Sequence, residues 1–211
     1  MQIEKLLNQS PIVPVIVIEK MEQAVPLAEA LLAGGLNALE VTLRSSIALS
    51  AIETIASNVP DANVGVGTIT QAEQFKSASD AGAGFAVSPG LTPALGQAAS
   101  QSGLPFLPGV FSPGDLIQAM ELGFNTCKLF PAKQAGGIDM LKALHGPFPE
   151  ARFCPTGGVN ADNFETFLAL PNVICVGGSW VCPPKLVAAG AWDEITRLAK
   201  NASKTAGNIQ S

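Results

Sequence analysis

The chain repeats one order of segments: an amphipathic stretch ends at glycine, and an apolar run rich in strand-forming residues follows. The order recurs along the first two thirds of the chain, with the glycines at Gly35, Gly82, Gly103 and Gly123. A glycine just beyond a helix supplies the left-handed residue that ends it. Helices that alternate with strands predict βα units around a parallel sheet. We therefore expect an α/β fold.

Eight segments of the 211-residue chain have the pattern of buried strands. They lie around residues 12–18, 38–43, 63–68, 84–88, 105–110, 126–131, 152–157 and 173–178. A helical stretch follows each of them, the last near residues 192–204. Eight βα units predict a compact (β/α)8 TIM barrel. A doubly wound open sheet is the competing topology.

Nothing in the sequence marks a boundary between domains, and no linker or low-complexity stretch interrupts the pattern. We expect one domain over residues 1–211, with a short N-terminal helix within residues 1–10 at the bottom of the barrel. Residues 201–211 are polar, and a tail of this kind is expected to fray.

The composition excludes several classes of partner. The formal net charge of −5 argues against a nucleic acid or an anionic membrane, which bind basic faces, but permits a small anionic substrate. No apolar stretch approaches the ~20 residues that span a bilayer. The N-terminus also lacks the pattern of a signal peptide. We expect a cytoplasmic protein without nucleic-acid or membrane partners.

The cysteines and the histidine do not form a metal-binding pattern. Cys127, Cys154, Cys175 and Cys182 show no Cys-x-x-Cys spacing. Reduced core residues are their expected role. His145 is the single histidine, so a His-rich zinc site is excluded. Its expected place is the end of a helix, where a cation is favourable. No metal is expected.

One charged residue stands in an apolar run. Lys128 lies within Thr126-Cys127-Lys128-Leu129-Phe130-Pro131-Ala132, which has the composition of a buried strand. Burying an ammonium group is unfavourable, so a lysine there is normally paired or deprotonated. A desolvated amine is a nucleophile that forms Schiff bases with carbonyl substrates. The alternatives are a structural partner of a carboxylate and a lysine that extends to solvent from the strand end.

Polar side chains also share one face of the second predicted strand. Side chains two residues apart point the same way, so Glu40, Thr42 and Arg44 lie together. The same rule places Phe130 on the face of Lys128. A carboxylate, a hydroxyl and a guanidinium near the C-terminal end of a barrel strand suit an active site. A Glu–Arg pair that only neutralises itself is the alternative.

Glycine-rich turns follow the last two predicted strands, at Gly157-Gly158 and Gly177-Gly178. Backbone amides freed by glycine can approach an anion, and these loops are the common phosphate site of barrel enzymes. Simple chain reversal is the alternative. An earlier pair, in Gly65-Val66-Gly67-Thr68, lacks the third glycine of a dinucleotide-binding fingerprint. Thr68 is instead a candidate for hydrogen bonding to a substrate oxygen.

Together these segments resemble the 2-keto-3-deoxy-6-phosphogluconate (KDPG) aldolase family over nearly the whole chain. The motifs, in the family's order, are Pro14-Val15-Ile16, Glu40-Val41-Thr42-Leu43-Arg44, Gly65-Val66-Gly67-Thr68, Ser88-Pro89-Gly90, Lys128-Leu129-Phe130-Pro131-Ala132, Cys154-Pro155-Thr156-Gly157-Gly158 and Gly177-Gly178-Ser179-Trp180. The resemblance implies a class I aldolase on a trimeric barrel, without a cofactor, that acts on a small keto-acid phosphate and often also cleaves 4-hydroxy-2-oxoglutarate. The family commonly has glutamate where this chain has Lys133, which bears on substrate preference.

The resemblance also implies residue roles. Lys128 would form the Schiff base with the C2 ketone, and Glu40 would act as general acid and base. Arg44 would bind the pyruvyl carboxylate with help from Thr68. Phe130 would keep the Schiff base dry. The remaining implied contacts are Thr156 at the carboxylate or carbonyl, and Gly157, Gly158, Gly178 and Ser179 at the distal phosphate.

Other functions fit parts of the same pattern. A sugar-phosphate isomerase or epimerase would use Glu40 for proton transfer and Lys128 only electrostatically. A class II aldolase would need a metal, and a non-catalytic sugar-phosphate sensor would need only the glycine turns. Within the aldolase interpretation, KDPG, its galactose-derived epimer and 4-hydroxy-2-oxoglutarate all remain candidate substrates.

Overall fold

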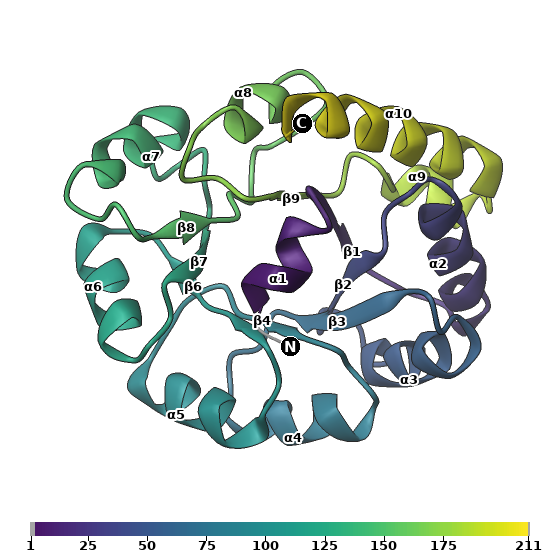
Figure 1. Cartoon of the computed structure of the whole chain (residues 1–211). Coiled ribbons are helices and arrows are strands. Elements are labelled where there is room, and N and C mark those ends of the chain that lie inside the picture. The colour runs from purple at the N-terminus through teal and green to yellow at the C-terminus, as the bar shows by residue number, and fades with distance from the viewer. Residues whose placement is uncertain (1–2, 211) are drawn as a thin grey trace.

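The computed structural model describes residues 3–210, in which strands and helices alternate (Figure 1). The strands are β1 (Ile12–Ile16), β2 (Ala38–Thr42), β3 (Asn63–Gly67), β4 (Ala86–Val87), β5 (Phe106–Leu107), β6 (Gly109–Val110), β7 (Thr126–Leu129), β8 (Arg152–Phe153) and β9 (Val176–Gly178). The α-helices are α1 (Ile3–Asn8), α2 (Ala24–Ala33), α3 (Ala48–Asn58), α4 (Glu73–Asp80), α5 (Pro93–Ser102), α6 (Pro113–Glu121), α7 (Gly137–His145), α8 (Phe164–Leu168), α9 (Pro184–Ala188) and α10 (Trp192–Gln210). A 3-10 helix, η1 (Met21–Gln23), precedes α2.

The paired strands run parallel. They form a six-stranded sheet in the order β5-β4-β3-β2-β1-β9 and a three-stranded sheet in the order β6-β7-β8. Isolated parallel bridges join Phe153 to Val173 and Thr156 to Gly177, next to β8 and β9. Figure 1 shows the strands curling inside a ring of helices. The predicted α/β fold with a parallel sheet is confirmed.

The fifth predicted strand is divided in two. β5 and β6 contain two residues each, and Pro108 lies between them. Proline has no N–H to give to a sheet ladder, so the strand is interrupted there. The carbonyl of Pro108 still accepts a hydrogen bond from the N–H of Lys128 at 2.8 Å. The interruption therefore leaves the segment in place beside β7.

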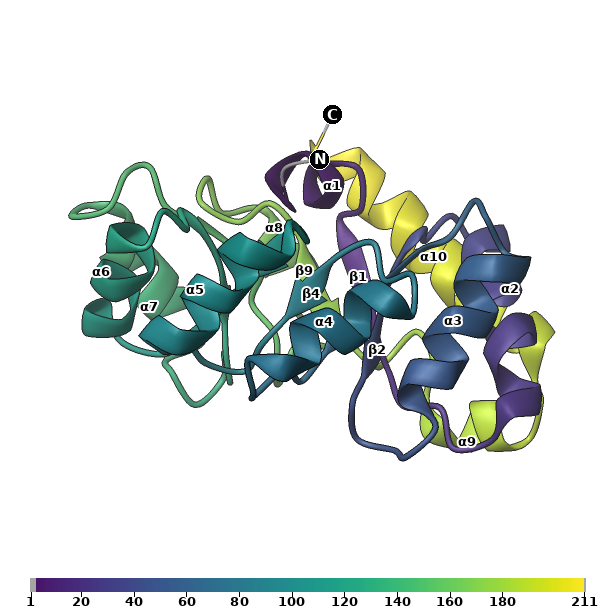
Figure 2. The ribbon, with the colours of Figure 1, turned by 90° about the horizontal axis from the view of Figure 1, so that it is seen from below.

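Apolar residues pack in two layers, one on each side of the strands. Leu39 and Val41 of β2 belong to the larger cluster, together with helix residues such as Ile52. The second cluster contains residues such as Phe85, together with Leu7 of α1. α1 is central in Figure 1 and lies at one edge of the molecule in Figure 2. It therefore covers the end of the strands from which β1 begins.

The expectation that residues 201–211 form a frayed polar tail is wrong for residues 201–210, which continue α10 to Gln210. Ile195, Ala199, Ala202 and Ala206 are buried and follow one another at helical spacing. This apolar stripe holds the polar segment against the domain. Residue 211 lies outside the described residues. No helix within residues 3–210 has both the length and the apolar character needed to cross a membrane.

Candidate active site

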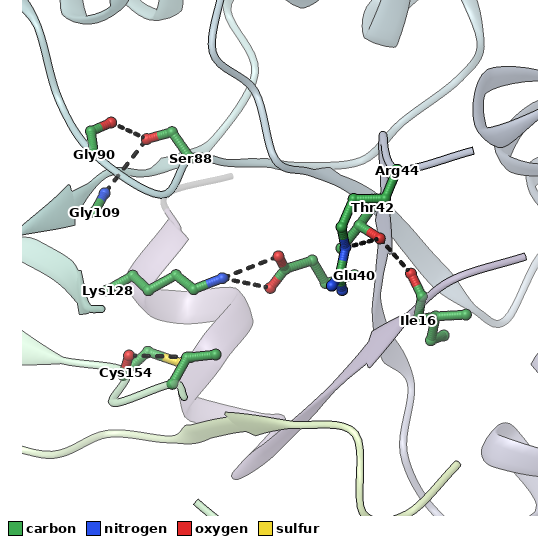
Figure 3. Close-up of polar contacts among 10 residues, drawn as sticks. Ile16, Glu40, Thr42, Arg44, Ser88, Gly90, Gly109, Lys128 and Cys154 are labelled. Atoms are coloured by element: carbon green, nitrogen blue, oxygen red, sulfur yellow. Dashed lines mark hydrogen bonds and ion pairs between the residues drawn. The ribbon is translucent and has the colours of Figure 1, made fainter. Parts of the chain in front are cut away.

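The side chains of Lys128 and Glu40 meet inside the ring of strands (Figure 3). Lys128 belongs to β7 and Glu40 to β2, and they are 5% and 3% exposed. The Nζ atom of Lys128 lies 3.0 Å from Oε1 and 3.3 Å from Oε2 of Glu40. Nζ also lies 5.2 Å from the centre of the Phe130 ring. The buried lysine is thus paired with the carboxylate expected to transfer protons.

Gly67 makes room for the carboxylate of Glu40. It lies on β3, the neighbour of β2, and a Cβ atom at this position would collide with Oε1 of Glu40. Gly65 leaves similar room for the ring of Phe85. The glycines of the Gly65-Val66-Gly67 motif therefore serve the packing of the site and lie within a strand.

Arg44 is anchored by Thr42. The hydroxyl of Thr42 donates to the carbonyl of Ile16 at 2.8 Å and accepts from Nε of Arg44 at 3.0 Å. The terminal Nη groups of Arg44 make no hydrogen bond within the described part of the chain. They are available for bidentate binding of a carboxylate.

The predicted catalytic and substrate-binding residues line one cavity of about 240 Å³. Its lining consists of Val15, Glu40, Thr42, Arg44, Thr68, Pro89, Lys128, Phe130 and Thr156. The cavity places a nucleophile, a carboxylate and a guanidinium around one space, with hydroxyl groups at its wall. This is the arrangement that a keto acid requires, because its carbonyl and its carboxylate must be bound at the same time.

Thr68 has a strained backbone. Its φ of 65° makes it the one non-glycine residue with positive φ within residues 3–210. A β-branched residue rarely adopts this conformation, and such strain concentrates at functional sites. Thr68 follows β3 directly and lines the cavity of Lys128. The strained backbone therefore belongs to a residue whose hydroxyl group is available at the site.

The two glycine-rich turns are adjacent in space. The N–H of Gly177 donates to the carbonyl of Pro155 at 3.0 Å, and a Cβ atom on Gly178 would lie 3.4 Å from the carbonyl oxygen of Val159. Gly157 has φ of +92°, a conformation that favours glycine. Residues from both loops are thus in contact at the ends of β8 and β9.

The members of the predicted phosphate site face different cavities. Gly158 has φ of +86° and borders a cavity of about 340 Å³ together with Lys133. The N–H of Lys133 donates to the carbonyl of Gly157 at 2.9 Å. Ser179 instead lines a second cavity, of about 220 Å³, which shares Arg44 with the cavity of Lys128. Ser179 is therefore the member of the predicted phosphate site whose cavity shares a wall residue, Arg44, with the cavity of Lys128.

Comparison with known proteins assigns the chain to a family. The family model of KDPG and KHG aldolases matches residues 3–198. The chain belongs to the KDPG and KHG aldolase family. It is 48% identical to the 2-dehydro-3-deoxy-phosphogluconate aldolase of Pseudoalteromonas atlantica, over 98% of this chain and 96% of that protein. It is 47% identical to the KHG/KDPG aldolase of Escherichia coli K12, over 94% and 93%.

Solved structures of KDPG aldolases have the same fold. The aldolase from Legionella pneumophila, with pyruvate captured as a covalent carbinolamine intermediate, superposes with a TM-score of 0.94 and 47% identity, over 95% of this chain and 98% of that one. The aldolase from Zymomonas mobilis with 3-phosphoglycerate has a TM-score of 0.89 and 45% identity, over 95% and 94%. Membership of the family makes this chain an aldolase, a carbon–carbon lyase.

The cysteines of this family member are buried and unpaired, as expected. Burial raises the pKa of the Cys127 and Cys182 thiols to about 12. Burial first, and then a hydrogen bond with Cys154, raises the pKa of Cys175 well above its usual value. His145 is the last residue of α7, as expected. Residues 3–210 contain no group of three His, Cys, Asp or Glu residues placed to hold a metal ion.

Some lining residues of this aldolase were not predicted. Val15 and Pro89 border the cavity of Lys128, while Glu19 and Gln23 border the adjoining one. Pro89 follows β4, so its place after a strand end was a usable signal. Gln23 lies in η1, within the segment predicted to be helical after the strand at residues 12–18, and its tertiary position brings it to the site.

Proposed function

We propose that this protein is a class I aldolase that cleaves KDPG to pyruvate and D-glyceraldehyde 3-phosphate through a Schiff base on Lys128. The observation that carries the proposal is the contact of 3.0 Å between a buried amine and a buried carboxylate in one cavity. Cleavage of 4-hydroxy-2-oxoglutarate to pyruvate and glyoxylate is a second expected activity. The names of the relatives support both substrates.

The reaction begins with proton transfer. Glu40 takes a proton from the Lys128 ammonium, and the freed amine attacks C2 of the keto acid to form a carbinolamine. Glu40 returns a proton to the carbinolamine hydroxyl, which leaves as water and gives a protonated imine. The Nη groups of Arg44 hold the carboxylate during these steps. The short distance between the Glu40 carboxylate and Nζ of Lys128 suits Glu40 for both of these proton transfers.

Cleavage follows from the charge on the imine nitrogen. The C3–C4 bonding electrons move into the imine as an enamine forms, while Glu40, again a carboxylate after the loss of water, takes the proton of the C4 hydroxyl and C4 becomes the aldehyde. Glu40 then protonates the enamine at C3, and water releases pyruvate from Lys128. Thr68 and Thr156 supply hydroxyl groups at the cavity wall, and the Phe130 ring shields the imine from solvent. The reaction needs no cofactor.

The distal phosphate is assigned to the adjacent turns after β8 and β9. Gly157, Gly158 and Gly178 provide backbone N–H groups, and Ser179 adds a hydroxyl beside the cavity that adjoins the Lys128 site. Phosphate held here supplies binding energy far from the reacting bond and positions it. The Zymomonas mobilis relative with 3-phosphoglycerate supports a phosphate site in the family.

The finer architecture is also a proposal: residues 1–211 form one closed (β/α)8 TIM barrel. The proximity of β5 and β6 in sequence and the bridges beside β8 and β9 support continuity between the two sheets. A homotrimer is expected from the family resemblance, and the exposed Phe111 and Ile117 offer apolar surface for it. Four unpaired cysteines agree with a cytoplasmic location. Light scattering tests the homotrimer, and cell fractionation tests the cytoplasmic location.

Borohydride trapping tests the proposed mechanism. Reduction in the presence of pyruvate is expected to leave a stable adduct that peptide mass mapping locates on Lys128. Lys128→Ala should lose the adduct and the turnover of KDPG, whereas Lys76→Ala, on the exposed face of α4, should keep both. Turnover that survives borohydride with substrate present would favour the isomerase or epimerase alternative, and the class I mechanism would be wrong.

A further inference from the structure

A second compartment adjoins the catalytic cavity. This compartment, of about 220 Å³, shares Val15 and Arg44 with the cavity of Lys128. Its other walls come from the segment after β1, from Ser179 and from the region of α9. If the pyruvyl half of the substrate occupies the space around Lys128, the aldehyde half extends past Arg44 into the second compartment.

Gln23 presents an unused hydrogen-bond donor at this compartment. Its side chain lines the compartment, and the residue is only 8% exposed. Its Oε1 atom accepts from the backbone N–H groups of Glu19 at 3.3 Å and Lys20 at 3.1 Å. Because the oxygen faces these donors, the Nε2 amide group is turned away from them. Throughout residues 3–210 no protein acceptor meets Nε2, so this donor is available to a bound ligand.

The neighbourhood of Gln23 matches a hydroxyl group. Nε2 can only donate, whereas the carboxylate of Glu19, which lines the same compartment, can only accept when ionised. A hydroxyl group can accept a hydrogen bond from Nε2 of Gln23 and donate one to the carboxylate of Glu19. A phosphate would meet the negative charge of Glu19 at this place, and the phosphate site proposed above lies at Ser179 and the glycine turns.

We infer that Gln23 is a specificity-determining residue that donates through Nε2 to the hydroxyl next to the aldehyde carbon in the aldehyde half of the substrate. The inference rests on the proposed aldolase function. The hydrogen bond gives the enzyme a preference for hydroxylated aldehydes over glyoxylate, which has no hydroxyl at this position. Gln23 binds substrate and takes no part in bond cleavage.

Aldol addition of pyruvate to three aldehydes tests the inference. D-Glyceraldehyde 3-phosphate has the hydroxyl and the phosphate, D-glyceraldehyde lacks the phosphate, and 3-phosphooxypropanal lacks the hydroxyl. Gln23→Met removes the donor and adds no charge that would act on the phosphate. Its kcat/KM should fall about 10- to 100-fold for the two hydroxylated aldehydes and change less than about twofold for 3-phosphooxypropanal.

The comparison between aldehydes is made within one protein sample, so a change in the folded fraction cancels. Glu22→Gln, at an exposed neighbour in η1, should leave all three rates unchanged. Equal losses for all three aldehydes, losses only for the two phosphorylated ones, or no loss at all would each overturn the inference. Exchange of the pyruvate methyl protons with deuterium by the wild type tests the aldolase function separately, because no aldehyde is present.

Discussion

The Nζ atom of Lys128 and the Oε1 atom of Glu40 lie 3.0 Å apart, although 88 residues separate them in the chain. Both side chains are withdrawn from solvent, so the pair is a buried ion pair when both groups are charged. A buried pair of this kind adds little to stability compared with apolar residues, but removal of one partner is costly. The pair is therefore best understood through the proton transfer that it allows.

Removal of one partner is expected to destabilise the fold. Lys128→Met leaves the carboxylate of Glu40 buried alone, and the free energy of unfolding should fall by about 3–5 kcal/mol. The double variant Lys128→Met with Glu40→Gln removes both charges and should recover most of this loss while remaining inactive. Urea denaturation measures all three proteins. Equal stability of the single and double variants would show that the charges are not buried as described.

Glu40→Gln is expected to remove most of the proton transfer at the site. The amide keeps the shape of the side chain but cannot take a proton from Lys128, so kcat for KDPG cleavage should fall by about 10²–10⁴-fold. Glu53→Gln, at an exposed position on α3, is the matched control and should retain full turnover. Steady-state kinetics with coupled detection of pyruvate provide the measurement. A loss of less than tenfold would exclude Glu40 as the principal acid and base.

Thr68→Gly should raise stability while it lowers activity. Relief of the left-handed conformation is worth about 1–2 kcal/mol, whereas glycine costs about 0.5–1 kcal/mol in backbone entropy. Activity should fall because the hydroxyl at the cavity wall is lost. Thr70→Gly, two residues further on and without positive φ, should only destabilise. Thermal unfolding measures the stability of both variants, and kcat/KM measures their activity. A Thr68→Gly protein less stable than wild type would contradict the strain argument.

Ser179→Asp is expected to change the choice of substrate. A carboxylate beside the proposed phosphate site repels the phosphate of KDPG, so kcat/KM for KDPG should fall about 10-fold or more. Cleavage of 4-hydroxy-2-oxoglutarate, which carries no phosphate, should change much less. Assays of pyruvate release give kcat/KM for each substrate, and the ratio of the two values is compared between the variant and the wild type. An equal loss for both would place the phosphate away from Ser179.

The N-terminus of α6 should make stability depend on acidic pH. Burial is the largest single influence on the pKa of Asp115 and raises it, but hydrogen bonds from the N–H groups of Ser112 and Phe111 and from the Ser112 hydroxyl together lower the pKa below its ordinary value. A lowered folded-state pKa adds stability above the unfolded-state pKa, and this stability is lost as the pH falls through the folded-state value.

Asp115→Asn removes this titration. At neutral pH the variant should be less stable than wild type by about 0.5 kcal/mol, a small value because solvent screens the half-buried carboxylate. The difference should disappear below the folded-state pKa, where the wild-type carboxyl is protonated. Urea denaturation of both proteins at neutral and strongly acidic pH provides the measurement. A difference that stays constant over this range would rule out the titration.

Local patterns in the sequence were sufficient to predict the alternation of helices and strands, because helix ends and strand runs depend on neighbouring residues. They also predicted that Glu40 and Thr42 share one face of β2, since side chains alternate along any strand, whereas Arg44 lies beyond the end of β2. The family resemblance then supplied the residues that line one cavity in the structure. The polar tail was predicted wrongly, because the burial of Ala202 and Ala206 depends on contacts with distant segments.

What the sequence determined by itself is the set of secondary-structure elements and the chemistry available on each of them. Only the tertiary structure decided that the Lys128 amine meets the Glu40 carboxylate and that Gly67 leaves space for this carboxylate. It also decided that the Nε2 group of Gln23 meets no protein acceptor among residues 3–210. These relationships depend on which strands lie beside one another and how far the sheet curls. Such distances arise from packing across the whole chain, and no local pattern encodes them.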